Sequence, residues 1–169
     1  MAARASRIAQ KPRHGRRCSC PADAGRRGAL SFYLDTSVIV SLFLDEPRTS
    51  AVAALIADGA SPIMISEFGV GEFSAAISTA IRMDRLTDID GIAILEDFDT
   101  WCADAVTFAA VTSADLKEAI AIVRRFDLKL LFPDALHVAT CRRVGATLIS
   151  ADRRQCGAAA RLGITVAAL

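Results

Sequence analysis

Short apolar runs alternate with longer segments of helical periodicity from Leu30 to the end of the chain, and this alternation constrains the fold more than any other feature. The runs that predict strands are 30–34, 62–65, 106–111, 146–149 and 164–167. The first predicted helix is capped by Thr36 or Ser37 and ends at Leu44. Further helices are predicted at 49–57, 67–83, 89–102, 114–127, 133–144 and 153–162. Continuously apolar strands separated by helices indicate an α/β domain with a central, mostly parallel sheet flanked by helices.

Charge divides the 169 residues into two parts. Residues 1–30 hold eight of the 20 Lys and Arg residues and one of the 19 Asp and Glu residues, which gives a net charge of +7. Residues 31–169 hold 12 basic and 18 acidic residues, which gives a net charge of −6. We therefore expect a basic, disordered extension at 1–29 and one folded domain at 30–169. The extension has alternative interpretations as unselected residues from an upstream start codon, an organellar transit peptide or a phosphate-binding arm.

Composition also indicates a compartment. No apolar run approaches the ~20 residues that cross a bilayer, so we expect no membrane span. The five cysteines have no regular spacing, which argues against a disulfide framework and favours a reducing compartment. We therefore expect a cytoplasmic protein.

Four acidic residues occupy positions that a purely structural account explains poorly. Asp35 and Asp152 follow two of the apolar strands, and the carboxyl ends of parallel strands line the ligand crevice of an open sheet. Both could instead be turn residues or helix caps. Glu72 and Asp134 lie on helical rows beside the apolar face, where a surface-edge glutamate and a first-turn aspartate are the alternatives.

Convergence of these four carboxylates at one point would need a cation. Unpaired carboxylates that lie close together repel and raise one another's pKa. A hard divalent ion removes that cost, and carboxylate oxygens with water are the ligands that Mg²⁺ or Mn²⁺ selects. Such an ion polarises a phosphoryl oxygen and lowers the pKa of a bound water, so the acids predict a phosphate-ester hydrolysis site. The ion would also let an acidic domain bind a phosphate substrate.

Four sequence blocks, in this order, resemble those of PIN-domain ribonucleases. They are Tyr33-Leu34-Asp35-Thr36-Ser37, Ser66-Glu67-Phe68-Gly69-Val70-Gly71-Glu72, Pro133-Asp134-Ala135-Leu136-His137-Val138-Ala139, and Leu148-Ile149-Ser150-Ala151-Asp152 followed by Leu162-Gly163-Ile164. The resemblance runs from about Phe32 to the C-terminus. In size and block spacing it is closest to the VapC toxins of bacterial type II toxin–antitoxin pairs.

This resemblance implies a three-layer α/β/α PIN-like fold and a metal-dependent endoribonuclease that uses Mg²⁺ or Mn²⁺ and leaves a 5′-phosphate and a 3′-hydroxyl. It implies an RNA substrate, a homodimer and a VapB-like antitoxin whose C-terminal segment covers the active site. The residues it implies are the catalytic, metal-binding acids Asp35, Glu72, Asp134 and Asp152, supported by Ser37 and Ser150. The basic extension departs from compact VapC chains.

Other polar residues near the blocks have less specific interpretations. His137 follows Asp134 by three residues, and we expect it to be a packed or interface histidine rather than a catalytic one. Four arginines could contact phosphate or form a solvated face: Arg142, Arg143, Arg153 and Arg154.

Rival functions lack residues that they need. A phosphatase of the haloacid dehalogenase type needs a second Asp two residues after the first, where Ser37 stands. The sequence contains no Gly-rich loop ending in Gly-Lys-Ser/Thr, and a zinc module built on His137 and Cys141 would need two further ligands. Two alternatives remain open, namely a catalytically inactive PIN-fold binding or scaffold module and a housekeeping RNA-processing PIN nuclease.

Overall fold

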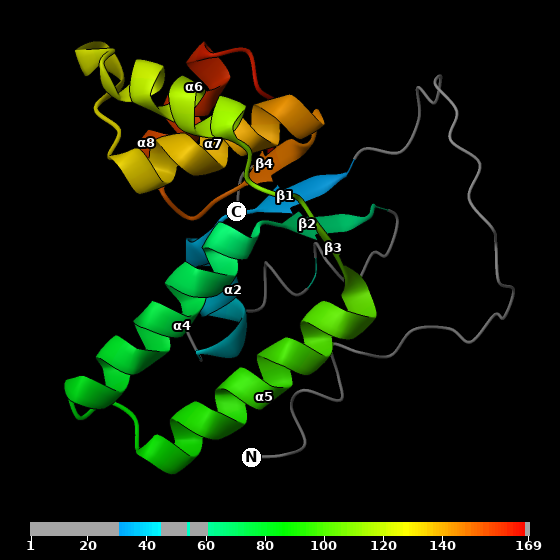
Figure 1. Ribbon diagram of the computed structural model, residues 1–169, viewed down its shortest axis with the longest axis vertical. Coiled ribbons are helices and arrows are strands. Elements are labelled where there is room, and N and C mark those ends of the chain that lie inside the picture. Colours follow the sequence, from blue (N-terminus) through cyan, green and yellow to red (C-terminus); the bar gives the residue numbers. More distant parts are fainter. Residues whose placement is uncertain (1–30, 45–53, 55–60, 168–169) are drawn as a thin grey trace, which may run out of the picture.

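Five short parallel strands form the central sheet of the computed structural model, which describes residues 31–44, 54 and 61–167 (Figure 1). The strands are β1 (Phe32–Leu34), β2 (Ile63–Ile65), β3 (Val106–Phe108), β4 (Thr147–Ile149) and β5 (Val166–Ala167). Their order is β3-β2-β1-β4-β5, and every neighbouring pair is parallel. The carboxyl ends of β1 and β4 are adjacent, because Leu34 pairs with Ile149.

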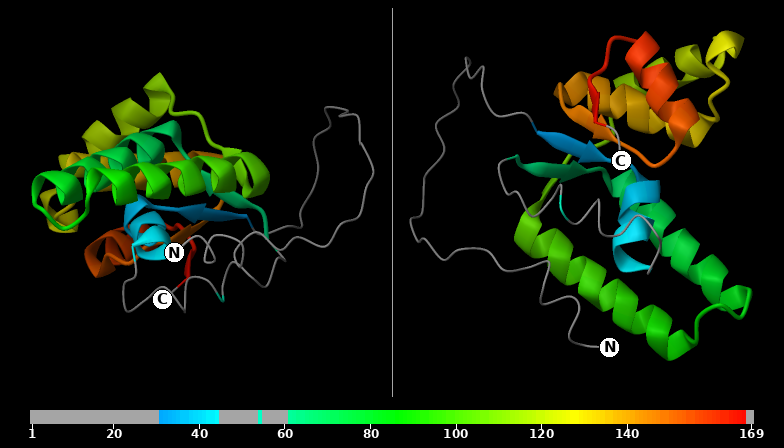
Figure 2. Two further views of the ribbon diagram at one scale, coloured as in Figure 1. Left: turned by 90° about the horizontal axis from the view of Figure 1, so that it is seen from below. Right: turned by 180° about the vertical axis from the view of Figure 1, so that it is seen from behind.

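Six helices and one 3₁₀ turn complete the described part of the chain. They are α2 (Thr36–Phe43), α4 (Glu67–Arg82), α5 (Asp88–Ala105), α6 (Ser113–Val123), η1 (Phe126–Leu128), α7 (Phe132–Val144) and α8 (Arg153–Arg161). Helices α4 and α5 lie side by side and extend away from the sheet (Figures 1 and 2). In the described ranges, none of the helices combines the length and apolar character of a bilayer span.

Alternate residues of the strands enter two separate cores. Tyr33 and Leu148 pack in a cluster with residues of α6, α7 and α8. Leu34 and Ile149, one position later in each strand, pack in a second cluster with residues of α2, α4 and α5. Successive side chains of a strand point to opposite faces, so one run of three apolar residues serves both cores. The predicted three-layer α/β/α architecture is confirmed.

Some predicted boundaries are wrong. The helix predicted at 114–127 ends at Val123, because Arg124 is its C-cap and the chain continues as the 3₁₀ turn η1, after which Lys129 adopts a left-handed backbone conformation with a φ of 54°. The strand predicted at 106–111 ends at Phe108, which pairs with Ile65, the last residue of β2. The predicted 1–29 extension lies outside the described residues, as does the 49–57 helix apart from residue 54.

The cap of the first helix also differs from the prediction. The N-cap of α2 is Asp35, not Thr36 or Ser37, and its carboxylate accepts a hydrogen bond from the backbone N–H of Val38. An aspartate satisfies the free N–H groups of a first turn as well as a serine does. The helix therefore begins immediately after the residue that ends the strand segment.

Candidate active site

Asp35 and Asp152 lie at the carboxyl ends of the adjacent strands β1 and β4. Both cap the helix that follows: Asp35 Oδ1 accepts from Val38 N at 3.2 Å, and Asp152 Oδ1 accepts from Arg154 N at 2.7 Å. The helix-cap interpretation is therefore correct for both residues. Each carboxylate has a second oxygen beyond the cap contact, so capping does not prevent ion binding.

Two serines hold the turn after β1 against the turn after β4. Ser37 Oγ donates to Asp35 Oδ1 at 2.7 Å and accepts from Ala151 N at 3.0 Å. Ser150 Oγ lies 2.7 Å from Asp35 Oδ2 and accepts from Asp152 N at 3.0 Å. These hydrogen bonds fix the position of the Asp35 carboxylate, which is only 4% exposed.

The charges of the same two aspartates affect the pKa of Asp134. Asp134 lies in the first turn of α7. Burial raises its pKa, and the charges of Asp152 and Asp35 raise it further. Burial likewise raises the pKa of Asp35, although hydrogen bonds from Ser150 and Ser37 act in the opposite direction. The charges of two aspartates from other parts of the chain therefore act on Asp134.

Glu72 has different partners from the three aspartates. Its Oε2 lies 2.6 Å from His137 Nε2 and accepts a hydrogen bond from Thr36 Oγ1 at 2.5 Å. Burial acts to raise the pKa of Glu72, but hydrogen bonds from His137 and Thr36 and the charge of His137 lower it more, so the pKa lies below its usual value. The structure thus brings three of the predicted acids together and holds Glu72 on the neighbouring histidine.

His137 is packed, as expected, but it also contacts a candidate acid. The ring is 3% exposed, and its Nδ1 lies 3.0 Å from the hydroxyl of Tyr33, which donates to Ser66 Oγ. Burial, more than any neighbouring charge, raises the pKa of Tyr33. The sequence places His137 three residues after Asp134, on the same face of a helix, and this was its only signal that His137 lies near a candidate acid.

The four arginines separate into two groups. Arg143 Nε donates to Asp115 at 2.7 Å, and Arg142 Nη2 lies 2.5 Å from Glu118 Oε1, so both are engaged at the C-terminal end of α7. Arg153 and Arg154 lie in the first turn of α8, and both are exposed. Arg154 Nη2 lies 3.9 Å from Asp152 Oδ2, beside a candidate acid, so this second pair stays a candidate for phosphate contact.

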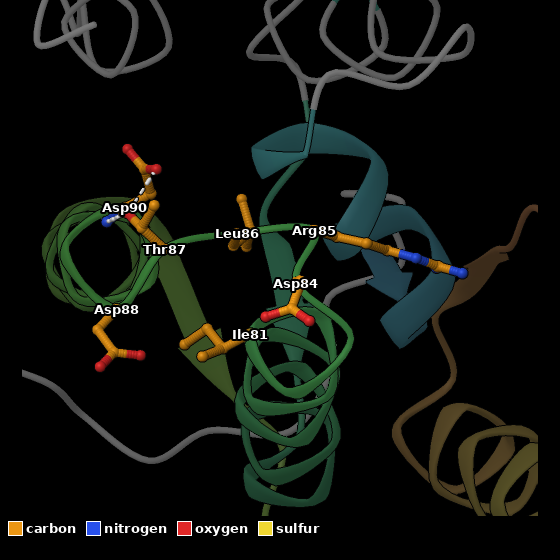
Figure 3. Close-up of a pocket in the computed structure, with 7 residues that line it drawn as sticks. All are labelled: Ile81, Asp84, Arg85, Leu86, Thr87, Asp88 and Asp90. Atoms are coloured by element: carbon orange, nitrogen blue, oxygen red, sulfur yellow. Dashed lines mark hydrogen bonds between the residues drawn. The ribbon is translucent and has the colours of Figure 1, made fainter.

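A pocket elsewhere in the molecule does not involve these acids. It has a volume of about 440 Å³ and lies at the turn between α4 and α5 (Figure 3). Its lining residues are Ile81, Asp84, Arg85, Leu86, Thr87, Asp88 and Asp90. Ile81 follows Glu72 by nine residues on α4, which at 1.5 Å per residue is about 14 Å along the helix.

The donor chemistry at the strand ends fits a hard divalent ion. As their side chains are oriented, no three His, Cys, Asp or Glu residues within the described ranges stand close enough together to ligate one ion. The three aspartates, Asp35, Asp134 and Asp152, nevertheless offer only oxygen ligands, which suits Mg²⁺ or Mn²⁺. A zinc site does not fit, because burial raises the pKa of the Cys141 thiol to about 12, and that thiol donates to the carbonyl of Ala146.

Comparison with known proteins gives a family and a set of similar folds. A model of the PIN domain matches residues 32–161. VapBC2 from Rickettsia felis, solved with a DNA fragment from its promoter, has a TM-score of 0.62 at 12% identity and covers 82% of this chain and 98% of its own. VapC20 from Mycobacterium tuberculosis, a sarcin-ricin loop cleaving toxin, has a TM-score of 0.61 at 22% identity and covers 76% and 95%. FitAcB from Neisseria gonorrhoeae has a TM-score of 0.60 at 16% identity and covers 80% and 95%.

No curated protein matches the sequence at a significant level. The family match spans most of the chain, and it includes all four acids and all of the sequence blocks except Leu162-Gly163-Ile164. The protein therefore belongs to the PIN-domain family, and its fold is that of the VapC toxins.

Proposed function

We propose that the protein is a metal-dependent endoribonuclease in which Asp35, Glu72, Asp134 and Asp152 hold Mg²⁺ or Mn²⁺. The observation that supports this most is that the charges of Asp35 and Asp152, which follow two adjacent strands, raise the pKa of Asp134 on α7. Repelling carboxylates destabilise a fold unless a cation or a proton neutralises them. Their presence at the carboxyl edge of a parallel sheet, where ligands bind, favours a functional site.

The residues of the chain would position the substrate and the acids. A bound ion would polarise the phosphoryl oxygen and lower the pKa of a coordinated water, which makes water a nucleophile at neutral pH. Ser37 and Ser150 hold the Asp35 carboxylate in place during that reaction. Arg153 and Arg154 would attract the phosphate backbone. The acidic carboxylates would otherwise repel it.

The protein would act as the toxin of a VapBC pair in the cytoplasm. Its partners would be an RNA substrate, a VapB-like antitoxin and a second copy of the chain in a homodimer. The similar structures support this assignment, since they include a VapBC complex and a toxin described as cleaving the sarcin-ricin loop. A reading frame for an antitoxin-like protein directly upstream of the gene would support the toxin role, and its absence would favour a housekeeping nuclease.

One observation favours the alternative of a catalytically inactive binding module. Glu72 is engaged by His137 and Thr36 rather than by the three aspartates. If this arrangement persists with metal present, only three carboxylates would face the ion. A metal titration separates the two functions, because a scaffold has no need for a cation at this edge.

The test combines metal binding and RNA cleavage in the purified protein. We expect calorimetry to detect binding of Mn²⁺ to the wild type and not to Asp35→Asn. We also expect cleavage of a structured RNA to require Mg²⁺ or Mn²⁺ and to be lost in Asp134→Ala with the circular dichroism spectrum unchanged. Asp104→Asn, a neutralised exposed aspartate of α5, is the control and should behave as wild type. Equal and negligible heats for wild type and Asp35→Asn, or undiminished cleavage by Asp134→Ala, would overturn the proposal.

A further inference from the structure

Gln155 is a buried amide on a helix row that is otherwise apolar. It lies in the first turn of α8 with 1% of its surface exposed, and Ala158 and Ala159 on the same side of the helix are buried too. A buried polar group without partners costs about 1–3 kcal/mol. A purely apolar side chain would fill this position without that cost, so the hydrogen bonds of Gln155 need an explanation.

The side-chain amide contacts Ser150 and the backbone of Asp134, and the backbone N–H of the same residue contacts Asp152. The backbone N–H of Gln155 donates to Asp152 Oδ1 at 3.4 Å, and its Nε2 donates to the backbone carbonyl of Asp134 at 3.3 Å. Its Oε1 lies 2.6 Å from Ser150 Oγ, and the same hydroxyl lies 2.7 Å from Asp35 Oδ2. One side chain thus links the turns after β1 and β4 to the first turn of α7.

The start of α7 depends on such a link. Its N-cap, Leu131, makes no side-chain hydrogen bond to the helix, unlike the capping residues Asp35, Ser66 and Asp152 of α2, α4 and α8. The first turn of α7 carries Asp134. The Asp134 carboxylate accepts a hydrogen bond from the backbone N–H of Leu131, and the hydrogen bond from Gln155 to the Asp134 carbonyl joins this turn to α8.

We propose that Gln155 is a positioning residue that sets the mutual geometry of Asp35, Asp134 and Asp152 for the metal ion. This inference rests on the proposed function. Gln155 does not touch the ion or the RNA; it acts through Ser150 and through the backbone of Asp134. Groups that orient metal ligands in this way contribute about 10–100-fold to metal affinity or activity.

The test is Gln155→Met in the full-length chain, because methionine keeps the length of the side chain and removes both amide contacts. We expect Mn²⁺ affinity by calorimetry to fall about tenfold or more. Activity at low Mn²⁺ should fall by a similar factor and recover at high Mn²⁺, whereas KM for RNA at saturating Mn²⁺ should not change. A change in packing alone would not move the Mn²⁺ midpoint.

Two further variants make each outcome decisive. Ile122→Val removes one methylene from a buried position of α6 in the same core and should lower stability without changing Mn²⁺ affinity. If Gln155→Met does not fold, Gln155→Leu removes the same two amide contacts with a smaller apolar side chain and should weaken Mn²⁺ binding to the same extent. If Gln155→Met folds and its Mn²⁺ affinity stays within twofold of wild type, this inference is overturned. Asp35→Asn tests the proposed function separately. Absence of Mn²⁺ binding in the wild type would overturn both.

Discussion

Replacing Asp35 by asparagine should stabilise the metal-free protein while it abolishes metal binding. Asparagine keeps an oxygen that accepts from Ser37 Oγ and Val38 N, and its amide nitrogen can donate to Ser150 Oγ, 2.7 Å from the present Oδ2. The single proton of Ser150 is then free for Gln155 Oε1, 2.6 Å away, instead of being shared between two acceptors. The variant thus loses a charge and keeps every hydrogen bond.

The size of the gain follows from the burial of the charge. Burying one ion costs several kcal/mol even after relaxation. The carboxylate of Asp35 is 4% exposed and accepts three hydrogen bonds, from Ser37, Val38 and Ser150, each contributing about 1.5 kcal/mol. The excess cost is on the order of 1–2 kcal/mol, in agreement with a pKa that burial raises. At about 2–4 °C per kcal/mol for a chain of this size, Tm should rise by about 2–8 °C.

The pH dependence of this gain has a definite sign. Because the folded-state pKa of Asp35 is raised, its ionisation costs stability above that pKa, and the cost disappears as pH falls toward the usual value of 3.8. The advantage of Asp35→Asn should therefore be full at pH 7 and shrink toward pH 4. Saturating Mn²⁺ should reverse the order, since a ligand at 100 times its Kd adds about 2.7 kcal/mol to the wild type alone.

Thermal unfolding followed by circular dichroism, at pH 4 and pH 7 and with or without Mn²⁺, measures all three effects. Asp104→Asn, at an exposed site, should shift Tm little at either pH. A metal-free Asp35→Asn that is less stable than wild type at pH 7 would refute the reasoning. So would a difference in Tm that is the same at both pH values.

Three further outcomes test other contacts. Asp115→Ala should lower stability by about 1–2 kcal/mol in urea unfolding, because the carboxylate accepts hydrogen bonds from Arg143 and from Thr112 in the capping box of α6. These hydrogen bonds lower the pKa of Asp115, so the wild type also loses this contribution as pH falls below about 4. His137→Phe should lower the free energy of unfolding by about 1–3 kcal/mol. A double-mutant cycle with Glu72→Gln should show a coupling energy of about 1 kcal/mol or more, and additive losses would contradict the contact. Arg154→Ala should raise KM for RNA and lower the salt dependence of binding by the equivalent of one phosphate contact. An unchanged KM would show that Arg154 does not contact the RNA.

Much of the fold could be predicted from the sequence because each element carries a local signal. The apolar runs before Asp35 and Asp152 form β1 and β4, and the helix predicted at 67–83 forms as α4. The early end of α6 was missed because the burial of Leu128 depends on the α7 and α8 side of the sheet, which lies later in the sequence. Local periodicity could not include that contact.

The sequence by itself determined the α/β alternation, the strand ends that carry Asp35 and Asp152, and the candidate status of four acids, because residue order and periodicity encode these features directly. Only the tertiary structure decided which acids share one environment. Asp35 and Asp152 lie at adjacent strand ends because β1 and β4 are neighbours in the sheet, whereas Glu72 pairs with His137, 65 residues away in the chain. The contacts of Gln155 likewise join residues from separate elements. Such contacts depend on packing between distant segments, and no local pattern specifies them.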